Sequence, residues 1–455
     1  MPATSLTAQA GQPGLVRAIG RWSFTALVVN SIIGSGIFGL PAILAKLLGS
    51  VSPLAYLLAA AGMVVIALCM AEVASRFRAA GGPYLYAREA FGQFVGLQVG
   101  WITWLVRITA AAANASLFVL YLAELWEGAT QPGVRLLLLL LIFGFLAGIN
   151  YRGVRPGARL SNVLAVAKLL PLVVFALVGL FFLRGENFQL RVAAGAAEWT
   201  QAILLLVFAY GGFEAAMIPA GEVKNPTRDA PFAILVALGL SALLYTLIQT
   251  VVVGTLPREA LTDPNVGPHA GRPLAAAANE FLGRGGGLLL AVGALISVSG
   301  LLSGTMLNSP RLTYALAERG DFPALFAAVH PRFRTPHISI LLYAGLSCVL
   351  AVVGMFQEIG AFQWNATLSA VARLLTYAST CLALMVFRRR SREAPGFRLP
   401  WALAFCLIGT GFCIWLALRM GRAEFIILGV TVLLAATTWL FARRRSGRVS
   451  AESRI

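Results

Sequence analysis

The sequence predicts an all-α, polytopic membrane protein with about twelve transmembrane helices, the first ten arranged as two groups of five. Hydrophobic residues make up 59% of the 455 residues and charged residues only 12%, and the mean hydropathy is +0.81. Because a soluble domain is about 25% charged, this composition excludes an ordinary soluble fold. The apolar residues form segments long enough to cross a bilayer, which takes about 20 residues. Glycines interrupt two of these segments, at 28–41 and 208–214.

The predicted spans follow the apolar segments along the chain. Length and apolarity place them at about residues 24–46, 51–74, 94–122, 135–149, 160–183, 199–220, 231–254, 286–316, 338–354, 362–387, 401–418 and 425–441. The fourth span is short, and residues 274–282 before the eighth are expected to form a short interfacial helix. The resulting organisation is a cytoplasmic tail at 1–20, a membrane-embedded core at 21–390 with halves at about 24–183 and 199–388, helices eleven and twelve at 391–442, and a basic cytoplasmic tail at 443–455.

The positions of the Lys and Arg residues predict the orientation. With the N-terminus inside, about two thirds of the 36 Lys and Arg residues fall in cytoplasmic segments, which favours cytoplasmic placement of both termini. The basic clusters at 388–392 and 443–448 are typical of contacts with anionic lipids. The net charge of +18 therefore does not indicate a nucleic-acid partner. We expect a multi-pass protein of the cell (inner) membrane that contacts membrane lipids.

The two interrupted segments carry the strongest functional signal. An unpaired backbone group in hydrocarbon costs several kcal/mol, so a helix is broken only where protein, water or a ligand supplies partners. Each break opens a group of five predicted spans, and an odd number of spans inverts the second group relative to the first. Two breaks in corresponding halves indicate the midplane substrate site of a secondary transporter.

Several motifs flank these breaks. They are Gly34-Ser35-Gly36-Ile37-Phe38 with Leu40-Pro41, Gly212-Phe213-Glu214 with Gly221-Glu222-Val223-Lys224-Asn225-Pro226, Gly81-Gly82-Pro83-Tyr84, and Gly320-Asp321-Phe322-Pro323. Together they resemble the signatures of the amino acid-polyamine-organocation family of permeases, over about residues 21–390. The resemblance implies a leucine-transporter-like fold, with two inverted five-helix repeats plus two further helices.

The resemblance also implies how an amino acid would bind. Its carboxylate would lie on backbone amides at the start of the second half-helix, whose dipole favours an anion, and its ammonium group on nearby carbonyls. The candidate substrate-binding residues are Ser31, Ile32, Ile33, Gly34, Ser35, Gly36, Phe208, Gly211 and Gly212. Phe208 matches the family aromatic that closes over the substrate, and Tyr210 is a weaker candidate for this role. The alternative is that the glycines serve helix packing and that the aromatic rings simply pack.

Lys168, in the fifth predicted span, is the first candidate for coupling. An unpaired charge within a span costs at least ~2.5 kcal/mol and is functional by default. In proton-coupled proteins that resemble this chain, a lysine here occupies the place of the second sodium ion of sodium-coupled transporters. A buried lysine changes its pKa readily, which would let it carry the driving proton. A permanently charged structural lysine, held by carbonyls of the first break, is the alternative. The expected coupling ion is a proton, with no other cofactor and no metal.

Glu214 is the second coupling candidate, since no other carboxylate lies well inside a predicted span. It would either take part in proton transfer or act as a hydrogen-bonded latch, and it could pair with Arg107 or Arg373. Arg107 could instead favour a substrate with a polar or acidic side chain. Carboxylates at the cytoplasmic span ends are expected to form latches; these are Glu72, Glu222, Glu318 and Asp321.

The expected function is amino acid transport by alternating access, with proton symport of neutral amino acids. The neutral preference rests on small residues at 110–113 and 303–305 and on the lack of an intramembrane acidic cluster. No nucleotide, metal-ligand or nucleophilic motif indicates an enzyme. The alternatives are an obligate amino acid or polyamine exchanger, a transporter-like amino acid receptor, and a channel. A monomer and a homodimer are both compatible with the sequence.

Overall fold

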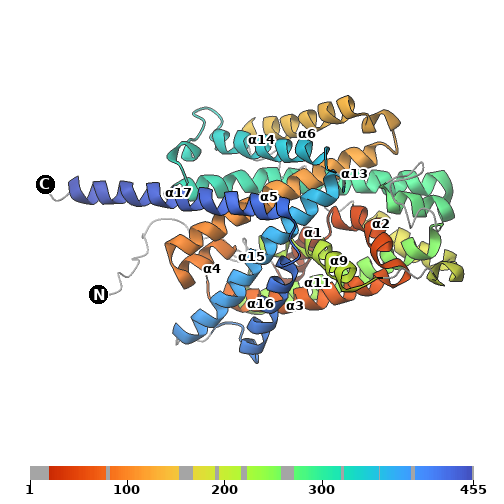
Figure 1. Cartoon of the computed structure of the whole chain (residues 1–455), viewed down its shortest axis with the longest axis horizontal. Helices are drawn as coiled ribbons and strands as arrows, with labels where there is room; N and C mark the ends of the chain where they lie inside the picture. Colours follow the sequence, from red (N-terminus) through yellow and green to blue (C-terminus); the bar gives the residue numbers. More distant parts are fainter. Residues whose placement is uncertain are drawn as a thin grey trace.

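The structure is a computed structural model that describes residues 20–77, 82–152, 168–189, 194–216, 223–257, 271–318, 322–357, 359–390 and 395–452. Its secondary structure there consists of α-helices and short 3-10 helices, which confirms the all-α prediction (Figure 1). The tail at 1–19, the first part of the fifth predicted span at 160–167, and the predicted latch residues Glu222 and Asp321 lie outside the described residues.

The α-helices follow the predicted spans closely. They are α1 (Arg21–Ile32), α2 (Gly36–Leu48), α3 (Ser52–Ser75), α4 (Gly82–Phe91), α5 (Gln93–Leu122), α6 (Pro132–Arg152), α8 (Leu169–Gly179), α9 (Ala196–Tyr210), α10 (Phe213–Ala216), α11 (Pro226–Thr255), α13 (Pro273–Glu318), α14 (His337–Gly354), α15 (Ala361–Arg390), α16 (Ala402–Ala417) and α17 (Arg422–Glu452). Within the described residues, eight helical stretches are long and apolar enough to cross a membrane, and three shorter apolar helices accompany them.

One prediction about an individual element was wrong in detail, and another agrees with the structure. The fourth span is not short, because α6 extends over 21 residues. The short helix predicted at residues 274–282 is present as the first part of α13, which bends at Gly283, where φ is +64°. Leu274 and Ala278 in this part are fully buried against the protein.

The helices pack as two groups that meet along α5 and α15. In Figure 1, α6, α13 and α14 lie on one side of α5, and α3, α11 and α16 lie on the other. Contacts link α14 with α6 and α5, α11 with α3 and α1, and α15 with α5, α9 and α3. The helices α1, α2, α9 and α10, which carry the breaks, are enclosed between the two groups.

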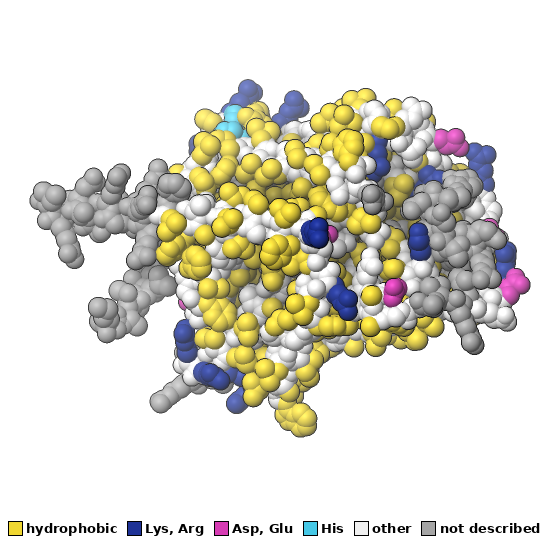
Figure 2. Space-filling model, in the orientation of Figure 1, with side chains coloured by type: hydrophobic (Ala, Val, Ile, Leu, Met, Phe, Trp, Pro, Cys, Tyr) yellow, Lys and Arg dark blue, Asp and Glu magenta, His cyan; other side chains and the backbone are white. Residues whose placement is uncertain are grey.

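The outer surface fits a lipid environment. In Figure 2 hydrophobic side chains cover most of the visible sides of the molecule, and most Lys and Arg side chains lie toward its edges. Large apolar side chains such as Leu137, Phe145 and Leu433 are more than half exposed. A soluble monomer rarely exposes so much continuous apolar surface, so the exposed helix faces agree with the membrane prediction.

Candidate functional site

The first break separates α1 from α2. Helix α1 ends at Ile32, Ile33 is extended with φ −71° and ψ 103°, and α2 begins at Gly36. The backbone N–H groups of Phe38 and Gly39 donate to the carbonyl of Ser35, both at 3.1 Å. The first N–H groups of a helix have no acceptor within that helix. The start of α2 therefore presents polar backbone inside an otherwise apolar bundle.

The second break touches the first. Helix α9 ends at Tyr210, and Gly212 adopts φ +120° before α10 begins. A Cβ atom at Gly212 would lie 2.1 Å from the carbonyl oxygen of Ser31, and one at Gly36 would lie 2.7 Å from the Cα of Ala209. Helix α1 thus contacts α10, and α2 contacts α9. These glycines do serve packing, and the packing brings the two breaks together.

A cavity of about 240 Å³ lies where the breaks meet. This volume is below the range of about 300–1,000 Å³ that is typical of pockets for drug-sized ligands, so the cavity suits a smaller molecule. The predicted site residues that line it are Ser31, Ile32, Gly34, Ser35, Gly36, Phe208, Gly211, Gly212 and Glu214. Ile33 and Lys168 are the two predicted site residues that do not line it.

The rest of the wall comes from α5, α13 and α15. Of the small residues expected to face the substrate, Ala110, Gly304 and Thr305 line the cavity, whereas 111–113 and Ser303 are not part of the lining. The polar lining residues that sequence reasoning missed are Asn30, Thr103, Asn114 and Asn308. An uncharged amide within an apolar span was the signal that could have found the three asparagines, because such side chains seek polar partners inside a bundle.

The two aromatic candidates have different environments. Phe208 lines the cavity, and its ring packs edge-on against that of Phe362, with the centroids 6.0 Å apart. Tyr210 does not line the cavity; its hydroxyl donates to the carbonyl of Tyr56 at 3.0 Å, and its side chain is fully buried. Phe208 therefore remains a candidate for the aromatic residue that closes over the substrate, whereas Tyr210 packs inside the helix bundle.

Lys168 lies behind the first break. Its Nζ donates to the carbonyl oxygens of Asn30 at 2.7 Å and Ile33 at 2.6 Å, and the side chain is only 1% exposed. The last carbonyls of a helix lack intrahelical partners, and the helix dipole favours a cation there. The carbonyl of Ile33 thus accepts a hydrogen bond from the side chain of Lys168. Ile33 therefore contacts Lys168 and is not among the residues that line the cavity.

Both carboxylate oxygens of Glu214 accept hydrogen bonds. One of its oxygens accepts from Nη1 of Arg373 on α15, and the other accepts from the N–H of Gly212 at 2.8 Å and the hydroxyl of Tyr377 at 2.9 Å. This arrangement is the predicted latch, and it identifies Arg373 as the partner. Arg107 on α5 lines the same cavity, but none of the described ion pairs includes it.

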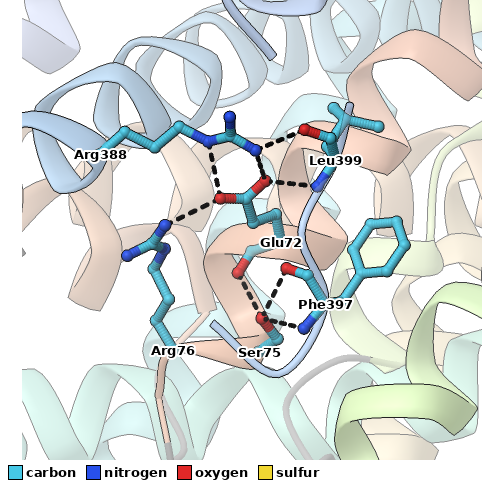
Figure 3. Close-up of polar contacts among 6 residues, drawn as sticks. All are labelled: Glu72, Ser75, Arg76, Arg388, Phe397 and Leu399. Carbon is cyan, nitrogen blue, oxygen red and sulfur yellow. Dashed lines mark hydrogen bonds and ion pairs between the residues drawn. The ribbon is translucent and has the colours of Figure 1, made fainter. Parts of the chain in front are cut away.

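A second charged cluster joins α3 to α15 (Figure 3). The fully buried side chain of Glu72 accepts from Arg76 at 2.8 Å, from Nε of Arg388 at 2.9 Å and from the N–H of Leu399 at 2.8 Å. This contact agrees with the latch predicted for Glu72. Glu318, by contrast, accepts a hydrogen bond from Tyr314 of its own helix, and the ion pairs among the described residues do not include it.

Comparison with known proteins agrees with this geometry. The family model described as "Amino acid permease" matches residues 19–442. The chain is 26% identical to the methylthioribose transporter of Bacillus subtilis (strain 168), covering 98% of this chain and 97% of that protein. It is 24% identical to the branched-chain amino acid permease of the same organism, covering 97% and 96%, and 26% identical to its serine/threonine exchanger, covering 85% and 87%. The chain therefore belongs to the amino acid permease family of the amino acid-polyamine-organocation superfamily.

Proposed function

We propose that this chain is a secondary active transporter that holds an amino acid at the two helix breaks and moves it across the membrane by alternating access. The observation that carries the proposal is the contact between the breaks, with Gly212 against the carbonyl of Ser31 beside the cavity. The family consists of transporters, so the expectation that the chain is not an enzyme is confirmed.

In this proposal the backbone of the breaks recognises the part common to all amino acids. The α-carboxylate lies on the amides of Gly34, Ser35 and Gly36, at the positive end of α2. The α-ammonium group lies on carbonyls that line the cavity from the other side, among them those of Ser31 and Gly211. A carbonyl oxygen has two lone pairs, so the carbonyl of Ile32 can serve as well while it accepts from Tyr245 at 3.1 Å.

The same proposal includes twelve crossings in two inverted repeats, with both termini in the cytoplasm of a cell whose inner membrane holds the protein. Each predicted span overlaps a described helix, and the breaks at α1–α2 and α9–α10 occupy corresponding places in the two halves. The leucine-transporter-like fold that the family implies supports this arrangement.

Lys168 is the proposed site of the coupling proton. Its ammonium group donates to the backbone carbonyls of Asn30 and Ile33. Ser31, which lies between these two residues in the chain, and Gly34, which follows Ile33, line the cavity. Hydrogen bonds from a charged donor are about twice as strong as neutral ones, so loss of the proton would loosen the segment that binds the substrate. If Lys168 stays charged, the protein is an exchanger, as the serine/threonine exchanger is by its name.

The test is uptake of a panel of labelled amino acids into proteoliposomes, with and without an inward proton gradient. We expect native uptake to rise with the gradient and Lys168→Ala to lose that dependence, while Lys46→Ala, which removes an exposed lysine of α2, behaves like the native protein. Uptake only against preloaded substrate would make the protein an exchanger. No uptake under either condition would overturn the transport proposal and favour a receptor.

The residues that line the cavity bear on the predicted preference for neutral amino acids in two ways. Ala110, Gly304 and Thr305 leave room for a side chain, as expected. However, the wall also contains the guanidinium of Arg107, for which the described residues provide no ion-pair partner.

A further inference from the structure

The charged side chains that line the cavity carry a net positive charge. Arg107, Arg373 and Glu214 all line it. Glu214 is engaged by Arg373, Tyr377 and the N–H of Gly212, which together use both of its oxygens. The described part of the chain brings no carboxylate within ion-pair distance of Arg107. The cavity therefore carries one positive charge beyond the Arg373–Glu214 pair.

Other features make the surroundings of this charge more positive. The N-terminal end of α2 faces the same cavity and carries a partial positive charge. Lys168 adds an ammonium group on the other side of the first break. A guanidinium stays charged at any physiological pH. A charged side chain inside a membrane is costly, so it is found there mainly where it serves a function.

Arg107 lies on the face of α5 that lines the cavity. Thr103, Arg107, Ala110 and Asn114 all line the cavity, and their spacing places them on one helical face. Ala110, one turn from Arg107, lines the same cavity with only a methyl side chain. Tyr343 donates its hydroxyl to the backbone carbonyl of Arg107 at 2.9 Å, which anchors this turn of α5 without using the guanidinium.

We propose that the transported amino acid has a carboxylate side chain, which Arg107 binds while the helix breaks bind the α-carboxylate and the α-ammonium group. A guanidinium presents its N–H donors in a fork that matches a carboxylate in two parallel hydrogen bonds. An amino acid with a cationic side chain is repelled by the same charge. This inference rests on the proposed transport function and replaces its neutral side chain with an acidic one.

The probes are L-glutamate and L-glutamine, which have nearly the same shape and differ in the charge of the side chain. For the native protein, we expect the KM of glutamate uptake to be at least about tenfold lower than that of glutamine, as for a site built to bind a specific polar group. In Arg107→Gln, glutamate uptake should fall at least about a hundredfold while glutamine uptake stays within about threefold of native. Arg107→Lys should restore part of the preference, because it keeps the charge but not the fork.

Arg284→Gln, which removes the charge of an exposed arginine, is the matched control and should keep the native preference. A second measurement needs no variant: glutamate should raise the melting temperature of the native protein in detergent more than glutamine does at equal concentration. Uptake of neutral amino acids that is unaffected by glutamate and by Arg107→Gln would overturn the inference and leave the transport function standing. Absence of uptake for every amino acid would overturn both.

Discussion

At the scale of single residues, Gly212 is the position that the account requires most strictly. Its φ of +120° is a conformation that L side chains rarely adopt, and an added Cβ would meet the carbonyl oxygen of Ser31 at 2.1 Å. We expect Gly212→Ala to separate the breaks and abolish uptake. Gly239→Ala is the matched control, because Gly239 is exposed on α11 and a Cβ there meets nothing within 4 Å. Since alanine favours a helix over glycine by about 0.5–1 kcal/mol, this control should keep native uptake and stability. Native uptake by Gly212→Ala would contradict the role given to the breaks.

Most of the individual residues of the cavity could be predicted from the sequence, but their pairing could not. Eight of the nine predicted substrate-binding residues line the cavity, because glycines and polar residues within an apolar span are visible in the sequence itself. The pairing of Glu214 with Arg373 was only one of several options, since residues 159 positions apart leave no signal in a single sequence. The contact of Lys168 with Asn30 and Ile33 was anticipated as one alternative, whereas its position behind the cavity wall depends on how the helices pack.

At the scale of elements, the Glu72 cluster ties α3 to α15 and to the segment before α16 (Figure 3). Glu72 is fully buried, and among the described residues Arg76, Arg388 and the N–H of Leu399 stabilise its charge. Breaking a buried pair by removing one partner typically costs about 3–5 kcal/mol. We expect Glu72→Gln to lower the melting temperature in detergent markedly. Glu186→Gln, at an exposed glutamate, should leave it unchanged. Equal melting temperatures for the two variants would contradict the stabilising role of the cluster.

The sequence predicts the ends of a helix well where an apolar segment alone determines its length. The predicted spans at 94–122, 231–254 and 338–354 coincide closely with α5, α11 and α14, since a helix must satisfy its own backbone in hydrocarbon. The separate helix α4 (Gly82–Phe91) was not predicted as an element, because its composition is too mixed to stand out. The bend of α13 at Gly283 and the burial of its first part arise from tertiary packing.

At the scale of the whole molecule, two groups of helices pack together, and a small cavity lies where the helix breaks meet α5, α13 and α15. The breaks belong to α1–α2 and α9–α10, whereas the facing wall belongs to α5 and α13. Alternating access would then be a movement of one group against the other around a fixed site. The latch of Glu214 with Arg373 joins the second break to α15, so it couples the site to a helix that contacts both groups.

The central claim is that backbone groups of the breaks hold the α-carboxylate and the α-ammonium group of an amino acid. The most direct test measures competition for uptake by two analogues of the best substrate in the uptake panel, one without the α-carboxylate and one without the α-amino group. We expect each analogue to compete at least about a hundredfold more weakly than the intact amino acid, because each leaves buried polar backbone unpaired. Competition by either analogue as strong as that of the amino acid would contradict the claim.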